Sequence, residues 1–188
     1  MTSYRDSRAF GIDDICRLLQ VVDGHLTDPA AVVIIGGAAA AFHRADSTTN
    51  DVDTNDALND ALQDAIQRAR AETGLEIPIN HSAVADVPWH FEDRLERQLP
   101  ELRNLQVWVL EKHDLVLSKS VRCDEHDLEQ LEELHAKNPL DFDVLVTRFR
   151  TEMTHAIGEP AKIRERFLEM IERLSGELKR VEADRATR

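Results

Sequence analysis

The sequence has few cysteines and no apolar run long enough to cross a membrane. Its two cysteines, Cys16 and Cys123, stand far apart, so they form neither a disulfide framework nor a metal-binding spacing. The longest apolar run, Ala30–Phe42, is shorter than the roughly 18 residues of a membrane-spanning helix. We therefore expect a cytoplasmic protein with reduced thiols and no membrane partner.

Basic residues are also scarce. The chain of 188 residues has 23 Lys and Arg against 36 Asp and Glu, which gives a formal net charge of −13. Proteins that bind nucleic acid non-specifically carry a basic footprint. That class is excluded for the chain as a whole, while a local basic patch remains open. The 8 histidines have no His-x-x-His or His-x-x-x-His spacing, which argues against a zinc site.

The residues that are present predict helices and short strands up to about residue 112, and helices after it. The β-branched run Ala31–Ile35 is typical of a strand buried on both faces, and Gly36 and Gly37 lead from it into a helix. We expect an α/β (α+β) fold with a small mixed sheet and flanking helices over residues 1–112, and a helical C-terminal part over 113–188 packed on it. Other expected elements are helices over Ile12–Leu26 and Ala57–Glu72, and strands over Asp51–Asp53, Leu75–Ile79 and Leu105–Leu110.

The C-terminal part is expected to contain capped amphipathic helices. Asp114 and Asp124 are the predicted N-caps of helices over Leu115–Arg122 and Glu125–Ala136. A further helix over Lys162–Ala183 carries apolar residues at alternating spacings of four and three, a heptad seam made of Phe167, Ile171, Leu174, Leu178 and Val181. We expect this seam to pack on its own domain, on a partner, or on a second copy in a homodimer.

Two features of the first half point to chemistry. A strand that turns through Gly36-Gly37 into a helix presents backbone N–H groups that attract phosphate, although the glycines could also serve only a tight turn. Asp51 and Asp53 are two residues apart, so on a strand both carboxylates point to one side, where a hard cation such as Mg²⁺ would relieve their repulsion. The alternative is a solvated loop edge in an acidic protein.

Together these residues resemble a known superfamily. Ile35-Gly36-Gly37, a spacer and Asp51-Val52-Asp53 resemble the first motif of nucleotidyltransferases with the DNA polymerase β-like fold. The finer pattern is similar to the AbiEii-type nucleotidyltransferase-like proteins of bacteria, some of which are toxins of toxin–antitoxin pairs. It covers roughly residues 30–136 and rests on Gly36, Gly37, Ala38, Ser47 or Thr48, Thr49, Asp51, Asp53, Ser118, Lys119, Arg122 and Asp127.

The resemblance implies transfer of a nucleoside monophosphate from an NTP to an acceptor, with release of pyrophosphate. The acceptor would be RNA, a protein or a small molecule, and a cognate antitoxin is an implied partner. Asp51 and Asp53 would hold Mg²⁺ or Mn²⁺, and Asp127 would support Lys119. The residues implied to contact the nucleotide are Gly36, Gly37, Thr49, Lys119 and Arg122.

The sequence departs from this pattern at two places. Toxin members carry Arg four residues before the first aspartate, where this chain has Ser47, with Arg44 nearby. The superfamily also has a third carboxylate on a later strand, and the region around Leu75–Ile79 offers only Glu76 and Asn80. Two alternatives therefore stay open: a non-catalytic module that binds nucleotide or a partner, and an acidic scaffold.

For three further residues a purely structural role is the alternative to a functional one. Lys119 lies on a predicted helix, where most lysines are solvated. Trp89 and Trp108 are more often core residues than platforms on which a nucleobase stacks.

Overall fold

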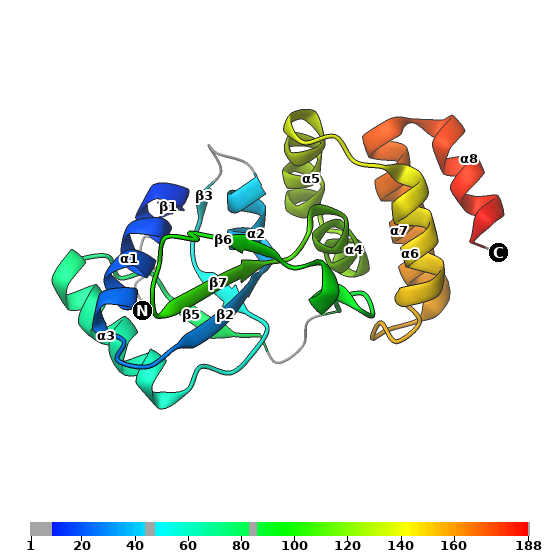
Figure 1. The fold of residues 1–188 in the computed structure, drawn as a ribbon. Helices are drawn as coiled ribbons and strands as arrows, with labels where there is room; N and C mark the ends of the chain where they lie inside the picture. Colours follow the sequence, from blue (N-terminus) through cyan, green and yellow to red (C-terminus); the bar gives the residue numbers. More distant parts are fainter. Residues whose placement is uncertain (1–8, 44–47, 83–85, 188) are drawn as a thin grey trace, which may run out of the picture. The chain divides into compact units, whose positions relative to one another are not determined.

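The computed structural model describes residues 9–43, 48–82 and 86–187 (Figure 1). The chain divides into two compact units. The first consists of Met1–Ala83 and Glu96–Val109, and the second of Val84–Leu95 and Leu110–Arg188. The second unit thus combines a short segment from the middle of the chain with the C-terminal helices.

A mixed five-stranded sheet forms the centre of the first unit. Its strands are β2 (Ala30–Ile35), β4 (Val52–Thr54), β5 (Ile79–His81), β6 (Glu96–Gln98) and β7 (Leu105–Val109). They lie in the order β5-β4-β2-β7-β6. The β2–β7 and β4–β5 pairs are parallel, and the β2–β4 and β6–β7 pairs are antiparallel. A separate small sheet pairs β1 (Phe10–Gly11) with β3 (Thr48–Thr49). The predicted α+β class is confirmed.

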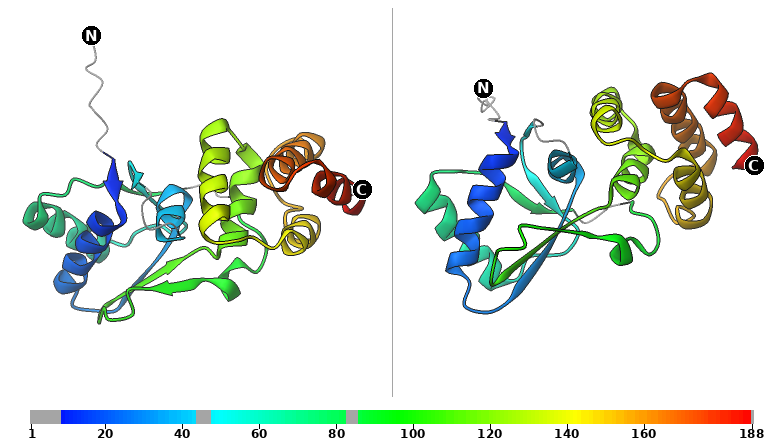
Figure 2. Two further views of the ribbon diagram at one scale, coloured as in Figure 1. Left: turned by 90° about the horizontal axis from the view of Figure 1, so that it is seen from above. Right: turned by 45° about the horizontal axis from the view of Figure 1, so that its top comes forward.

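Two helices, α1 (Ile12–His25) and α3 (Asp60–Thr73), lie side by side against this sheet (Figures 1 and 2). The apolar core between helices and sheet contains Leu19, Val22, Val32, Ile34, Val52, Leu58, Leu62, Ile66, Ile79 and Leu105. Successive residues of a strand point to opposite faces. Val33, Ile35 and Asp53 therefore belong to the sheet face that turns away from α1 and α3.

Some strand and helix limits in this unit differ from the prediction. β2 is not buried on both faces, because Ala31 is exposed and Val33 only half-buried. The helix expected from Ala57 begins at Asp60, where the Asn59 side chain accepts a hydrogen bond from the Leu62 amide at 2.9 Å. Gly74, in the left-handed region with φ of +68°, ends α3.

The strand expected over Leu75–Ile79 is wrong, and β5 begins only at Ile79. Pro78 has no N–H to donate, and the Ile77 carbonyl is held by the guanidinium of Arg70 at 2.6 and 3.0 Å instead of by a strand. Leu75 and Ile77 are nevertheless buried, so apolar alternation arises here without strand pairing.

The second unit is helical apart from its connecting segments. It contains the 3₁₀ helix η1 (Phe91–Arg94), α4 (Lys112–Arg122), α5 (Glu125–Lys137), α6 (Phe142–Glu152), α7 (Pro160–Ser175) and α8 (Glu177–Ala186). α7 packs against α4, α5 and α8. Phe149 and Phe167 join α6 to α7 by stacking with their ring centroids 4.0 Å apart. Within the described part of the chain, no helix is both long and apolar enough to cross a membrane.

The single helix expected over Lys162–Ala183 is two helices. Gly176, with φ of +89°, separates α7 from α8 and interrupts the heptad seam. Phe167 and Ile171 are buried in α7, whereas Leu178 in α8 is 83% exposed. A continuous seam is therefore wrong, and the homodimer it suggested stays a prediction.

Candidate functional site

The glycine pair lies where β2 ends and α2 (Gly36–His43) begins. Gly36 has φ of +62°, a conformation that favours glycine. A Cβ atom at Gly36 would lie 3.0 Å from Oδ2 of Asp53, and one at Gly37 would lie 2.9 Å from Oγ1 of Thr49. Both positions need glycine because these two side chains approach the start of α2 so closely.

Asp53 lies in the middle of β4, directly across from Ile35 in β2 and from Asn80 in β5. Its neighbours Val52 and Thr54 are buried, and Val52 belongs to the core beneath α1 and α3. The half-buried Asp53 side chain therefore projects from the other face of the sheet, at the end of β2 where the glycine pair begins.

Asp51 is half-buried and comes directly before β4, so the expected strand is shifted by one residue. The Thr49 hydroxyl donates a hydrogen bond to the Asp51 carbonyl oxygen at 3.0 Å, which fixes the turn from β3 into β4. Asp51 therefore directly precedes β4, and Asp53 lies within it. The glycine pair, Thr49 and the aspartate pair form one local arrangement in the first unit.

The residue across from Asp53 on β5 is Asn80, not an acid. Glu76, the other residue considered, is exposed and lies before β5. Among the described residues there is no group of three or more His, Cys, Asp or Glu side chains that could share a metal ion. Ser47 and Arg44, which bear on the missing arginine, lie outside the described residues.

In the second unit, Lys119, Arg122 and Asp127 form an ion-paired cluster. Nζ of Lys119 donates to Oδ1 of Asp127 at 2.6 Å. The Arg122 guanidinium donates to both Asp127 oxygens, at 2.9 and 3.0 Å. Asp127 is fully buried and Lys119 is only 8% exposed, so the alternative of a solvated lysine is wrong. The Arg122 side chain is 71% exposed.

Asp127 holds these cations through its own placement in α5. The Asp124 carboxylate accepts a hydrogen bond from the Asp127 amide at 2.9 Å, which confirms Asp124 as the predicted N-cap. Burial alone would raise the pKa of Asp127, but hydrogen bonds from Arg122 and Lys119 and their positive charges lower this pKa below its usual range. The carboxylate therefore stays ionised and fixes the Lys119 ammonium.

Residues 12–174 match the model of a protein family described as nucleotidyltransferase of unknown function, DUF6036. The chain belongs to this family. No curated protein and no solved structure matches the chain. The family match includes the glycine pair, both aspartates and the Lys119 cluster. The nucleotidyltransferase superfamily predicted from the glycine and Asp-x-Asp motifs is therefore confirmed.

The oxygen atoms around β4 of this DUF6036 nucleotidyltransferase suit a magnesium–nucleotide complex. Mg²⁺ is usually bound by one or two carboxylates together with substrate phosphates and water. Asp51 and Asp53 supply two carboxylates, and Asn80 supplies an amide oxygen from the neighbouring strand. Positions 36 and 37 have no side-chain atoms to fill the space against Asp53 and Thr49. The residues present therefore fit the ion that the family implies.

The second unit of this nucleotidyltransferase also contains an ion-pair network that its sequence did not predict. Asp114 is not a helix cap; Glu111 caps α4, accepting a hydrogen bond from the His113 amide at 3.1 Å. Asp114 is fully buried, and it accepts hydrogen bonds from Arg94 at 2.8 and 3.1 Å and from Arg148 at 2.8 Å. An acid directly before the apolar run Leu115–Leu117 was the only signal in the sequence.

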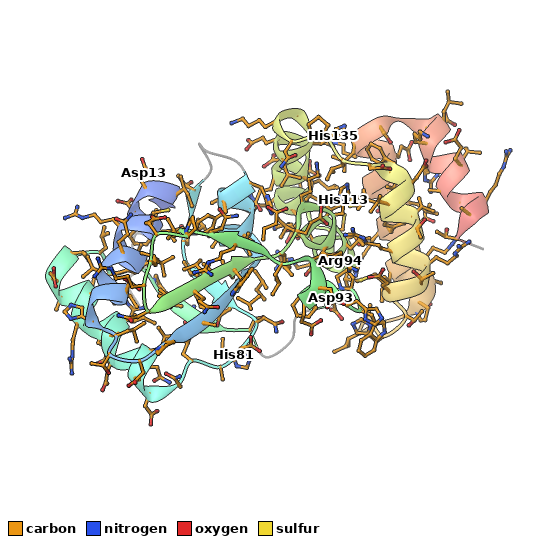
Figure 3. The ribbon with its side chains drawn as sticks, viewed as in Figure 1. Asp13, His81, Asp93, Arg94, His113 and His135 are labelled. Atoms are coloured by element: carbon orange, nitrogen blue, oxygen red, sulfur yellow. The ribbon has the colours of Figure 1, made fainter. Side chains whose placement is uncertain are left out.

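Arg94, labelled in Figure 3 next to Asp93, joins three parts of the second unit. Besides Asp114 it donates to the Glu152 carboxylate at 2.7 Å and to the Trp89 carbonyl at 3.1 Å. Arg148 also donates to Glu111 at 2.6 Å. Burial would raise the pKa of Glu111, but hydrogen bonds from His113 and Arg148 lower it to about 2. These contacts fasten η1 to α4 and α6.

Proposed function

We propose that this protein transfers a nucleoside monophosphate from an NTP to an acceptor and releases pyrophosphate. The observation that carries the proposal is the close approach of Gly36 to Asp53, because it places a carboxylate against the backbone at the start of a helix. Helix N-termini attract phosphate, and carboxylates hold the Mg²⁺ that accompanies it. Membership of the DUF6036 nucleotidyltransferases supports the same chemistry.

In this reaction the acceptor hydroxyl loses its proton to solvent and its oxygen bonds to the α-phosphorus. The bond from that phosphorus to the bridging oxygen breaks, and pyrophosphate leaves. When bound, Mg²⁺ would offset the negative charge that develops on the phosphate oxygens. Asp51, directly before β4, and Asp53, in the middle of β4, would hold the ion. The backbone amides of Gly36 and Gly37 would orient the phosphates, beside the turn that the Thr49 hydroxyl fixes by donating to the Asp51 carbonyl.

Within the second unit, Lys119 and Arg122 offer positive charge to a phosphate group, and Asp127 is their positioning residue. Its buried, ionised carboxylate fixes the position of the Lys119 ammonium, which lowers the entropy lost when phosphate binds. The Lys119 ammonium has three N–H groups, and its hydrogen bond to Asp127 uses one. The exposed Arg122 guanidinium can add a bidentate contact to a phosphate.

We propose that the acceptor is a protein hydroxyl or a small molecule in the cytoplasm, because a net charge of −13 disfavours tRNA. The similarity to AbiEii-type proteins supports a growth-arresting toxin whose cognate antitoxin is its protein partner. Controlled expression tests this role: the wild type should arrest bacterial growth, and the double variant Asp51→Asn, Asp53→Asn should not.

A second function, a non-catalytic nucleotide-binding module, is favoured by one observation. The position across from Asp53 on β5 is Asn80, whose amide cannot act as a general base. Two carboxylates would suffice to bind Mg²⁺ and NTP. This module predicts binding of the nucleotide without transfer.

Thermal melts with Mg²⁺, Mn²⁺ and NTP varied separately test the binding site. Metal with NTP should raise the melting temperature, because a ligand that binds only the folded state stabilises it by mass action. The double variant Asp51→Asn, Asp53→Asn should lose that shift. Asp64→Asn, on the exposed face of α3, is the matched control and should keep it.

Transfer from radiolabelled NTP to components of a cell extract separates the two functions. Label incorporation that requires Asp51 and Asp53 supports the enzyme. A thermal shift without incorporation supports the non-catalytic module. A wild type that responds to no combination of metal and NTP would contradict both.

A further inference from the structure

The sheet face that carries Asp53 also carries an aromatic side chain. Val33 in β2 lies across from Trp108 in β7, and Trp108 lies across from Arg97 in β6. Residues paired across neighbouring strands point to the same face. Val33 and Ile35 are two residues apart in β2, and Ile35 lies across from Asp53. Trp108 and Arg97 therefore share the face of Asp53, away from α1 and α3.

Trp108 and Arg97 are arranged as a stacking pair on this face. The Arg97 guanidinium carbon lies over the Trp108 ring, 5.8 Å from its centroid. That distance is at the outer limit of a cation–π contact. Trp108 is half-buried, which holds the indole in place, and Arg97 is exposed, so it can move outward. The pair thus offers a fixed aromatic ring and an adjustable planar cation above it.

The separation from Asp53 suits a nucleotide. Trp108 is two strands from Asp53 across the sheet and two residues along it. With the usual strand spacing and rise per residue, their Cα atoms are about 12 Å apart. A triphosphate held at Gly36 and Asp53 would extend its ribose and base over Val33 toward the indole.

We propose that Trp108 and Arg97 form the nucleobase subsite for the NTP, an inference that rests on the function proposed above. The base stacks on the Trp108 ring, and the Arg97 guanidinium covers the base from the solvent side. Stacking uses the flat face that every base has. The subsite therefore binds purine and pyrimidine NTPs by the same contact, with tighter binding of the larger purines.

Trp89 provides a matched comparison within the same chain. It is more exposed than Trp108, and its ring already contacts the His155 ring with centroids 4.4 Å apart. It belongs to the second unit, so it shares no sheet face with Asp53. Replacing Trp89 removes a tryptophan without touching the proposed subsite.

The test compares ATP with inorganic tripolyphosphate, both with Mg²⁺, by isothermal titration of the full chain. Trp108→Leu and Arg97→Ala should weaken ATP binding, the former by about tenfold as in other base–aromatic stacks. Both variants should leave tripolyphosphate binding unchanged, because that ligand has no base. Trp108→Phe should keep part of the ATP affinity, and Trp89→Leu should keep all of it.

A fluorescence measurement covers the case in which Trp108→Leu does not fold. In the variant Trp89→Phe the only tryptophan is Trp108, and ATP should quench its emission while tripolyphosphate should not. Two outcomes would overturn the base subsite alone. In the first, the wild type binds both ligands but ATP does not quench the Trp108 emission. In the second, Arg97→Ala loses affinity for ATP and for tripolyphosphate by the same factor. A wild type that binds neither ligand overturns the proposed function and this inference with it.

Discussion

Gly36 and Asp53 lie so close together that a Cβ atom added at position 36 would be 3.0 Å from the Asp53 Oδ2 atom. The two residues come from different elements, the start of α2 and the middle of β4. Their contact brings the glycine motif and the aspartate motif into one site. A side chain at position 36 would displace the carboxylate that we assign to the metal.

We predict that Gly36→Ala lowers both stability and metal–nucleotide binding. The left-handed conformation of Gly36 costs a residue with a Cβ atom about 1–2 kcal/mol, and displacement of Asp53 adds loss of binding. Gly74→Ala is the matched control: Gly74 has φ of +68° with no atom within 4 Å of its Cβ position. It should lose similar stability in urea denaturation and keep the Mg²⁺–NTP affinity measured by titration calorimetry. Equal affinity in both variants would contradict the role of the contact.

Asn80→Asp should create the third carboxylate next to Asp53. Without metal, the added negative charge should lower the melting temperature, because like charges on neighbouring strands repel. With Mn²⁺ the variant should gain a larger thermal shift than the wild type. Glu76→Asp, at an exposed position before β5, is the control and should change neither value. An unchanged metal response in Asn80→Asp would show that Asn80 does not face the ion.

Lys119→Ala should destabilise the protein, unlike the truncation of a solvated lysine. It leaves the fully buried Asp127 with Arg122 as its remaining cation, and breaking a buried pair costs about 3 kcal/mol. The folded-state pKa of Asp127 is lowered, so the stability from its ion pairs is present above the unfolded pKa of about 3.9 and is lost as the pH falls through the folded pKa. The difference between wild type and variant should therefore be largest at neutral pH and narrow below about pH 4.

Urea denaturation at neutral and acidic pH measures this difference. The control is Lys179→Ala, which removes an exposed pair with Glu182 and should leave the free energy of unfolding nearly unchanged at either pH. A constant difference at every pH would show that Lys119 stabilises by packing and not through Asp127.

Asp114→Asn should loosen η1 and its neighbouring loop. The substitution keeps the size of the side chain but leaves Arg94 and Arg148 without their buried counter-charge, at a cost of about 3 kcal/mol. The Trp89 amide, which donates to the Glu152 carbonyl at 3.1 Å, should then exchange faster with deuterium. Asp93→Asn, an exposed neighbour of Arg94, should leave that exchange rate unchanged. Protection of Trp89 in Asp114→Asn equal to the wild type would contradict the network.

Several elements were predictable because their determinants are local. The apolar spacing of α1, the N-cap Asp124 and the turn from a β-branched strand through Gly36 depend on residues within a few positions of each other. The helix and strand boundaries that were predicted wrongly depend on contacts with residues outside the segment concerned. Apolar alternation at Leu75 and Ile77 reflects burial of an irregular segment whose carbonyl is bound by Arg70, and periodicity cannot distinguish that from a strand.

The sequence by itself determined the nucleotidyltransferase motifs, the α+β class and the shared face of Lys119 and Arg122, since spacing along a strand or helix sets which way side chains point. Only the tertiary structure decided that Asn80 lies across from Asp53, that Trp108 shares its sheet face, and that Asp114 is buried between two arginines. The physical reason is that strand register and the burial of charge result from the pairing of segments far apart in the chain. The free energy of a strand register or of a buried ion pair is a sum over contacts in the whole sheet or helix cluster. A short stretch of sequence does not contain the residues that make those contacts.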